Sequence, residues 1–204
     1  MSTIDFVTVG VTDTAAAEQF YRDAFGLGDR VRVRPTDEPT SGFRGFTLSL
    51  VVAQPATVDG FLSSALEAGA TSLKPGAKSL WGYGGVVQAP DGAVWTIASS
   101  SKKDTGPATR QVDEFVLQLG VEDVTESKQW YVEHGVPVHK AYGRKYVQLG
   151  DPSSPVTLAL YQRRALAKVA GVDADGTGSH RLLISGAAAP LTDPDGFVWA
   201  AAPG

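Results

Sequence analysis

Two short sequence patterns occur twice in this chain of 204 residues, and in the same order each time. The first is Gly-Val-x-Asp, at positions 10–13 and 120–123, and in both copies a pair of aromatic residues begins seven positions after the Asp. The second is Pro-Asp-Gly-x-Val-Trp, at positions 90–95 and 194–199. Self-similarity of this kind indicates an internal duplication, so the two halves should build related arrangements.

The first copy is predicted to open with a strand and a helix. Residues Ile4–Val11 alternate as a half-buried strand does, with valines on one face and Phe6 and Thr8 on the other. A helix follows, capped by Asp13 or Thr14, because apolar residues recur at helical spacing up to the glycine after Phe25. The face that carries Phe6 and Thr8 is the one that can line a cavity.

The second copy repeats this opening. Val112–Val121 is the equivalent strand, with Glu114 and Gln118 on the face equivalent to Phe6 and Thr8, and a helix runs on to His134. Each Pro-Asp-Gly core combines a fixed φ, a self-capping side chain and a free glycine, which predicts a tight turn before a closing strand.

The remaining segments are assigned by β-propensity, helical spacing and turn residues. Further strands are predicted at Arg30–Arg34, Phe43–Val52, Thr71–Pro75, Val94–Ser99, Lys145–Leu149, Val156–Tyr161 and His180–Ser185, and further helices at Thr57–Ala68 and Gln162–Ala170. Residues 36–42 and 173–179 are predicted loops, and Lys78–Gly85 is a predicted glycine-rich connection that carries Trp81 and Tyr83.

A polar segment without periodicity separates the copies, which is typical of a linker. We therefore predict a first domain at residues 1–100, a linker at 101–111 and a second domain at 112–204. The second domain is shortened near its end, because only a few residues separate its strand His180–Ser185 from the closing turn.

Bulk properties exclude several functions. The formal net charge is −4 and Lys and Arg are scattered, so no surface suits a nucleic acid. The absence of cysteine excludes disulfides, thiolate metal sites and cysteine nucleophiles. No stretch is apolar enough for a signal peptide or a membrane span, which predicts a cytoplasmic protein without a membrane partner.

The two patterns, in this order and repeated, resemble the vicinal oxygen chelate superfamily of glyoxalases, bleomycin-resistance proteins and extradiol dioxygenases. The resemblance covers residues 4–99 and 112–202. It implies an α+β fold of tandem domains built from paired βαβββ modules, each pair curling a mixed sheet around a cavity that holds a metal or a ligand. It also allows a homodimer, although one chain already holds two domains.

Enzymes of that superfamily place His or Glu at about four positions of the cavity. In this chain the opening-strand His position falls on Phe6 and Val116, and the closing-strand Glu position falls on Thr96 and Ala200. The remaining position falls near residues 44–46, and in the second copy its stretch holds His180. A divalent metal needs at least three N or O donors, so we predict no metal and no other cofactor.

Several residues remain as candidates for binding or chemistry. The predicted ligand-binding residues lie on cavity faces or on the glycine-rich connection: Phe6, Thr8, Trp81, Tyr83, Thr96 and Gln118. Trp81 and Tyr83 can stack on a planar ligand or close the mouth of the cavity. Glu114 and His180 are the candidates for acid–base catalysis, with the alternative that His180 is a hydrogen-bonded residue at a strand start.

Two functions follow from this resemblance. The first is a metal-independent protein that binds a small aromatic or antibiotic-like molecule, as the bleomycin-resistance branch does. The second is a glyoxalase- or dioxygenase-like enzyme, a lyase or dioxygenase with a non-standard or metal-free active site. The blank ligand positions favour the first.

Overall fold

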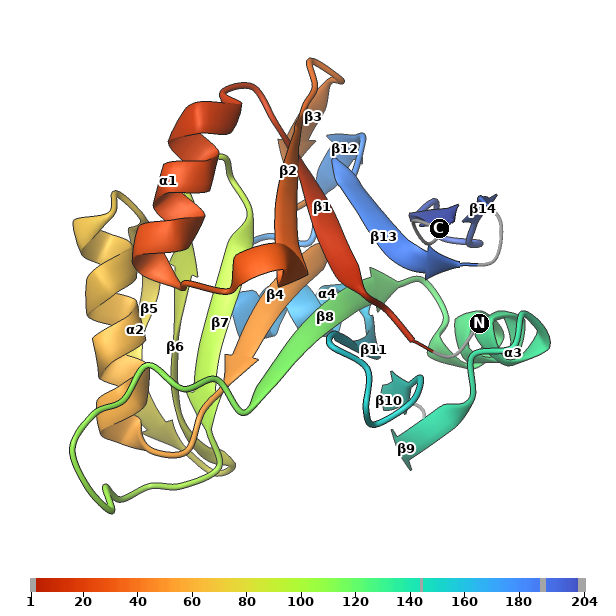
Figure 1. The fold of residues 1–204 in the computed structure, drawn as a ribbon. Coiled ribbons are helices and arrows are strands. Elements are labelled where there is room, and N and C mark those ends of the chain that lie inside the picture. Colours follow the sequence, from red (N-terminus) through yellow and green to blue (C-terminus); the bar gives the residue numbers. More distant parts are fainter. Residues whose placement is uncertain (1–2, 144, 188–189, 202–204) are drawn as a thin grey trace.

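The computed structural model describes residues 3–143, 145–187 and 190–201, and Figure 1 shows its fold. The strands form an eight-stranded, a five-stranded and a two-stranded sheet. The α-helices are α1 (Thr14–Ala24), α2 (Pro55–Glu67), α3 (Val124–Glu133) and α4 (Arg163–Ala170), and a 3-10 helix, η1, spans Gly28–Arg30. Among the described residues, no helix has both the length and the apolar character needed to cross a membrane.

The eight-stranded sheet joins the two halves of the chain in its middle. Strand β4 (Phe46–Val51) pairs antiparallel with β8 (Glu114–Val121). Outward from β4 lie β7, β6 and β5 in that order, and outward from β8 lie β11, β10 and β9. These outer strands are β5 (Thr71–Ser79), β6 (Gly82–Gln88), β7 (Val94–Ser99), β9 (Val138–Tyr142), β10 (Tyr146–Leu149) and β11 (Thr157–Gln162). Each half therefore contributes four strands.

The five-stranded sheet joins the beginning of the chain to its end. Strand β1 (Phe6–Val11) pairs parallel with β2 (Val31–Pro35) and antiparallel with β13 (Leu182–Ala187). Beyond β13 lie β15 (Val198–Ala201) and β14 (Leu191–Thr192). Both main sheets thus combine strands from the two halves: in Figure 1 the red β1 lies beside the blue β13, and the orange β4 lies beside the green β8.

The predicted α+β fold of paired strand–helix modules with mixed sheets is confirmed, and the structure adds which modules pair. The first module, which opens with β1, pairs with the last, which contains β13. The two middle modules, which open with β4 and β8, pair with each other. The division of the chain at residues 101–111 stays a prediction, because neither main sheet is confined to one side of it.

Local structure departs from the predictions in three places. The predicted connection Lys78–Gly85 is instead part of the β5–β6 hairpin, which turns at Leu80 and Trp81. Glycine is needed at the start of β6, because a Cβ on Gly82 would clash with the backbone oxygen of Ser99. The fully exposed strand β9 was not predicted, and the predicted loops contain the two short strands β3 (Thr40–Gly42) and β12 (Gly176–Gly178), which pair with each other.

The cap predicted at Asp13 is present, and the structure adds an equivalent cap at Asp123 and the buried core. The Asp13 carboxylate accepts a hydrogen bond from the backbone N–H of Ala16 at 3.0 Å, and Asp123 caps α3 in the same way. Trp95 is fully buried, with its ring 4.2 Å from that of Phe25 and 5.9 Å from that of Phe115. One core cluster therefore includes a helix end of the first module and strands of the next two.

Each repeated helix is tied to a repeated turn by a tyrosine hydroxyl. Tyr21 of α1 donates a hydrogen bond to the Asp91 carboxylate, and Tyr131 of α3 donates to Asp193, the residue before the second turn. Both phenols are buried. Burial, and then the neighbouring carboxylate, raise the pKa of each tyrosine well above its ordinary value. The two sequence patterns of each copy thus contact each other directly.

Replacing Tyr21 or Tyr131 by Phe should lower the free energy of unfolding by about 1–3 kcal/mol, because a buried carboxylate loses its donor. The raised folded-state pKa has a second consequence. The stability it confers is fully present below the ordinary tyrosine pKa of about 10 and is lost above it, by about 1.4 kcal/mol per pH unit for each such tyrosine.

Urea unfolding near neutral pH and above pH ~10 tests both effects, with Tyr142→Phe as a control because Tyr142 is 68% exposed. Y21F and Y131F should each lose less stability at alkaline pH than the wild type, and Y142F should match the wild type. An identical alkaline loss in all four proteins would contradict the assignment.

Candidate ligand-binding site

The face of the eight-stranded sheet opposite α2 and α3 carries most of its polar side chains. On β4 and β8, Leu48, Leu50 and Leu117 belong to the main core. The residues between them point the other way, and the register aligns Ser49 with Thr96 and Val116. We call this surface the inner face; it carries Thr47, Ser49, Val51, Thr96, Ala98, Glu114, Val116, Gln118, Gln148, Thr157 and Ala159.

Helix α4 covers part of the inner face. It packs on β8, β11, β4 and β7, so closely that a Cβ on Gly120 would lie 3.1 Å from Cα of Arg163. The Lys74 ammonium of β5 donates to the backbone oxygens of Lys168 and Val169, at 2.7 Å each. Because the last carbonyls of a helix lack intrahelical donors, Lys74 caps α4 and fixes its end against the sheet.

A hollow of about 260 Å³ lies beside α4. Its lining includes Thr96, Ala98 and Val169, together with the glycines of β6 and Trp81 at the tip of the β5–β6 hairpin. Trp81 is 85% exposed. Of the described residues that line it, Lys74 alone is charged, and its ammonium is engaged by α4. This hollow, which we call the Trp81 hollow, is therefore largely apolar.

A second cavity, of about 530 Å³, is polar and is bordered by the inner-face residues Val51, Glu114, Gln148 and Thr157. Glu114 lies in its wall, and its Oε1 accepts hydrogen bonds from Gln148 Nε2 and Thr157 Oγ1, at 2.7 Å each. Its other carboxylate oxygen, Oε2, accepts no hydrogen bond from the described residues. We call this the Glu114 cavity; its other charged or titratable lining residues are Arg30, Asp113, His139, Lys140 and Asp151.

This arrangement of sheets matches that of solved structures. Glyoxalase I from Zea mays aligns over 98% of this chain and 92% of its own, with a TM-score of 0.63 and 13% identity. A mutant of the same enzyme aligns over 98% and 93%, with a TM-score of 0.62 and 14% identity. A candidate dioxygenase from Bacillus subtilis aligns over 95% and 72%, with a TM-score of 0.54 and 13% identity.

The chain has the fold of the vicinal oxygen chelate superfamily. No protein-family model matches its sequence, and no curated protein does. The likeness thus rests on structure, and at these identities it concerns the vicinal oxygen chelate fold alone.

The vicinal oxygen chelate fold implies a metal site on the inner face, and the residues present do not fit one. Thr96 and Val116, at two of the predicted ligand positions, lie on either side of Ser49 in one row across the central strands. Hydroxyl and apolar groups do not replace the His, Asp or Glu ligands of a divalent metal. Within the described ranges, no three His, Asp or Glu side chains are grouped to hold an ion.

The structure brings four of the predicted site residues to the inner face or its rim. Thr96 lines the Trp81 hollow, with Trp81 at the rim, and Glu114 lines the Glu114 cavity. Gln118 belongs to the same face, where its Oε1 accepts a hydrogen bond from Thr47 at 2.7 Å. The two halves of the chain therefore supply one surface together.

Three other predicted ligand-binding residues lie elsewhere. The Tyr83 hydroxyl donates to Asp59 of α2 at 2.8 Å, so its ring is on the helix-covered face, although Tyr83 also borders the hollow. Phe6 and Thr8 belong to the five-stranded sheet. The guanidinium of Arg32 lies 3.6 Å from the centre of the Phe6 ring and covers it.

The contacts of His180 match those of a hydrogen-bonded residue at a strand start rather than those of a catalytic residue. Its Nδ1 lies 2.5 Å from the backbone oxygen of Arg44, and its Nε2 lies 3.1 Å from that of Asp195. The ring also stacks on Phe197, with centroids 4.0 Å apart. Both nitrogens are thus engaged by the backbone, and His180 connects two modules instead of lining the inner face.

Sequence reasoning missed the partners of Glu114 and the contribution of α4. Gln148 and Thr157 lie on predicted strands, but their approach to Glu114 depends on the parallel pairing of β11 with β8 and the antiparallel pairing of β10 with β11. The alternation in Val156–Tyr161 could have placed Thr157 on the inner face once that pairing was known. Val169 carried no signal beyond its position on a helix.

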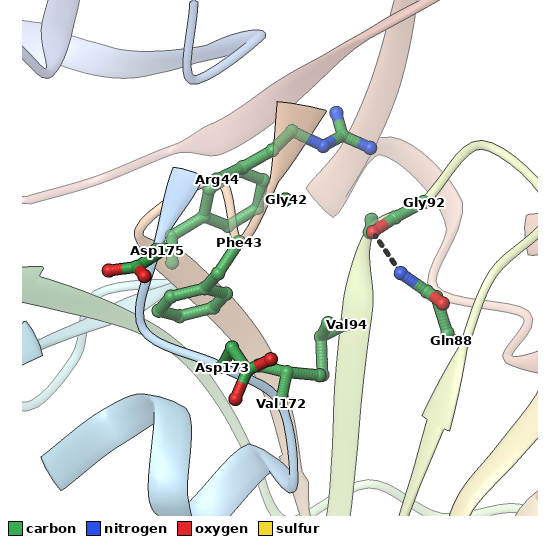
Figure 2. Close-up of a pocket in the computed structure, with 11 residues that line it drawn as sticks. Gly42, Phe43, Arg44, Gln88, Gly92, Val94, Val172, Asp173 and Asp175 are labelled. Atoms are coloured by element: carbon green, nitrogen blue, oxygen red, sulfur yellow. Dashed lines mark hydrogen bonds between the residues drawn. The ribbon is translucent and has the colours of Figure 1, made fainter. Parts of the chain in front are cut away.

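A further cavity, of about 310 Å³, lies on the other side of α4 and was not predicted. Figure 2 shows Asp173 and Asp175 on one side of it and Gln88 and Gly92 on the other. Gln88 donates to the Gly92 carbonyl at 3.2 Å, and Nη2 of Arg44 donates to Asp91. The buried Nη1 of Arg44 has no hydrogen-bond partner among the described residues.

Replacing Lys74 by Met should loosen α4. The substitution keeps the aliphatic stem and removes two hydrogen bonds to helix carbonyls, so we expect a loss of about 1–2 kcal/mol in the free energy of unfolding. Hydrogen exchange should become faster in residues 163–170. Lys78→Met on the same strand is the matched control, because Lys78 is exposed. Unchanged exchange in K74M would show that packing alone holds α4.

Proposed function

We propose that this chain binds a small aromatic molecule in the Trp81 hollow, without a metal ion. The observation that carries the proposal is an apolar hollow of about 260 Å³ with an indole, 85% exposed, at its rim. The aligned residues Thr96, Ser49 and Val116 are not metal ligands, which supports the metal-free form of the proposal. An aromatic ligand would cover Trp81, which the protein alone leaves in water.

The size of the hollow limits the ligand. Pockets for drug-sized molecules occupy about 300–1,000 Å³, so this hollow suits one or two fused rings with part of the ligand outside it. Stacking on an aromatic side chain contributes about 0.5–1.5 kcal/mol beyond the area buried.

The second candidate is a metal-free enzyme of the lyase or dioxygenase kind, with Glu114 as its acid or base. It is favoured by one observation: Glu114 lines a cavity, and its Oε2 accepts no hydrogen bond from the described residues. However, Gln148 and Thr157 hold Oε1 in a fixed position, which suits an acceptor that holds a ligand. Fold likeness does not supply a reaction.

The absence of a nucleic-acid partner, a homodimer and a cytoplasmic location stay predictions from the sequence. The small-molecule partner is the part of the partner prediction that the Trp81 hollow supports.

Protein purified without chelator or added metal should contain well under one equivalent of Zn, Ni, Mn or Fe per chain. The reason is that the inner face lacks the three N or O donors that a divalent ion needs. Elemental analysis measures this directly. A stoichiometric metal that EDTA removes, with a fall in melting temperature, would contradict the proposal.

Trp81→Ala should weaken binding of 2-naphthalenemethanol about tenfold, which corresponds to loss of about 1.4 kcal/mol of stacking. Calorimetric titration measures the affinity. The melting temperature should change little, because Trp81 is 85% exposed. Leu80→Ala, at the same tip and 78% exposed, is the control and should bind as the wild type does. A large loss of stability in W81A would instead make Trp81 a structural residue.

A further inference from the structure

The geometry points to a two-part site: the Trp81 hollow and the Glu114 cavity bind one ligand together, an aromatic ring that carries a hydrogen-bond donor, either an alcohol or a protonated amine. This inference rests on the proposed function for its aromatic half. It adds the polar half and the chemical class of the group bound there.

The two cavities have lining residues in one row of the inner face, although no described residue lines both. Ala98 lines the Trp81 hollow, and Val51 and Glu114 line the Glu114 cavity. The register pairs Val51 with Ala98 on one side and with Glu114 on the other, so the three residues stand in one row. Neighbouring strands lie about 4.8 Å apart, which places Ala98 and Glu114 about 10 Å apart. A bicyclic ring with a one-carbon arm can span that length.

The carboxylate of Glu114 is held in place by hydrogen bonds to one of its two oxygens. Gln148 and Thr157 both donate to Oε1, which fixes the side chain from two neighbouring strands. No described residue donates to Oε2. An ionised carboxylate accepts hydrogen bonds and donates none, so the ligand group that meets Oε2 must be a donor. A ligand carboxylate or phosphate does not fit this position.

The other acidic and basic residues of the Glu114 cavity offset one another, so their net charge does not select the ligand. Asp113 and Asp151 are acidic, and Arg30 and Lys140 are basic. Hydrogen bonds from Ser153 lower the pKa of Asp151, so that carboxylate is already engaged. Selection therefore depends on the direct contact with Oε2, and removal of that contact should matter more than removal of another charge.

Three probes with the same ring separate the two halves of the site: 2-naphthylmethylamine, 2-naphthalenemethanol and 2-methylnaphthalene. Their affinities are measured by calorimetric titration of the full chain. We expect the wild type to bind the amine and the alcohol about tenfold more tightly than the methyl compound, since a hydrogen bond to a charged group contributes about 1.5–3 kcal/mol.

Glu114→Gln tests the contact, because it keeps an acceptor for Gln148 and Thr157 and removes the charge at Oε2. E114Q should weaken binding of the amine about tenfold, of the alcohol less, and of the methyl compound not at all. Asp113→Asn is the matched control, since it removes one negative charge from the same cavity, and it should leave all three affinities within about twofold. The melting temperature of E114Q, expected to match the wild type, shows that the variant is folded.

The outcomes distinguish this inference from the proposed function. If all three probes bind the wild type equally well, or if E114Q and D113N have the same effect on the amine, the two-part site is wrong while the aromatic hollow survives. If none of the probes binds, the proposed function fails and the inference fails with it. Tenfold discrimination that is lost in E114Q alone supports the two-part site.

Discussion

The antiparallel pairing of β4 with β8 is the contact on which the rest of the structure depends. It runs from Phe46 opposite Leu119 to Val51 opposite Glu114 and joins the two halves of the chain in one sheet. Without it, Thr96 and Glu114 would belong to separate surfaces. With it, the inner face is continuous from the β5–β6 hairpin to β9, and Ala98 of the Trp81 hollow stands in one row with Val51 and Glu114 of the Glu114 cavity.

Local patterns predicted the elements well, because each depends on nearby residues. The alternation in Ile4–Val11, the cap at Asp13 and the repeated Pro-Asp-Gly turns are all found where expected. The pairing of the first module with the last joins residues more than 170 positions apart, as in the contact of Phe6 with Ser185. No periodicity within a strand specifies its partner, so this part of the fold came from the structure.

In the candidate site too, local patterns predict some features, and others depend on residues distant in the sequence. Alternation correctly assigns Thr96, Gln118 and Glu114 to one face of the sheet, and their role in binding stays a prediction. It does not show what lies next to a side chain, such as Asp59 of α2 beside Tyr83 or the guanidinium of Arg32 over Phe6. Lys74 illustrates the same limit, because its role depends on the carbonyls of a helix about ninety residues away.

The measurement that tests the central claim most directly is a ¹H–¹⁵N NMR titration of the full chain with 2-naphthalenemethanol in the presence of EDTA. The account predicts shifts confined to the inner face and its rim, at the Trp81 indole and at the amides of Gly84, Ala98 and Glu114. Shifts centred on Phe43, Asp173 and Asp175 would place the ligand in the cavity of Figure 2 instead. Shifts that need an added divalent metal would contradict a metal-free site.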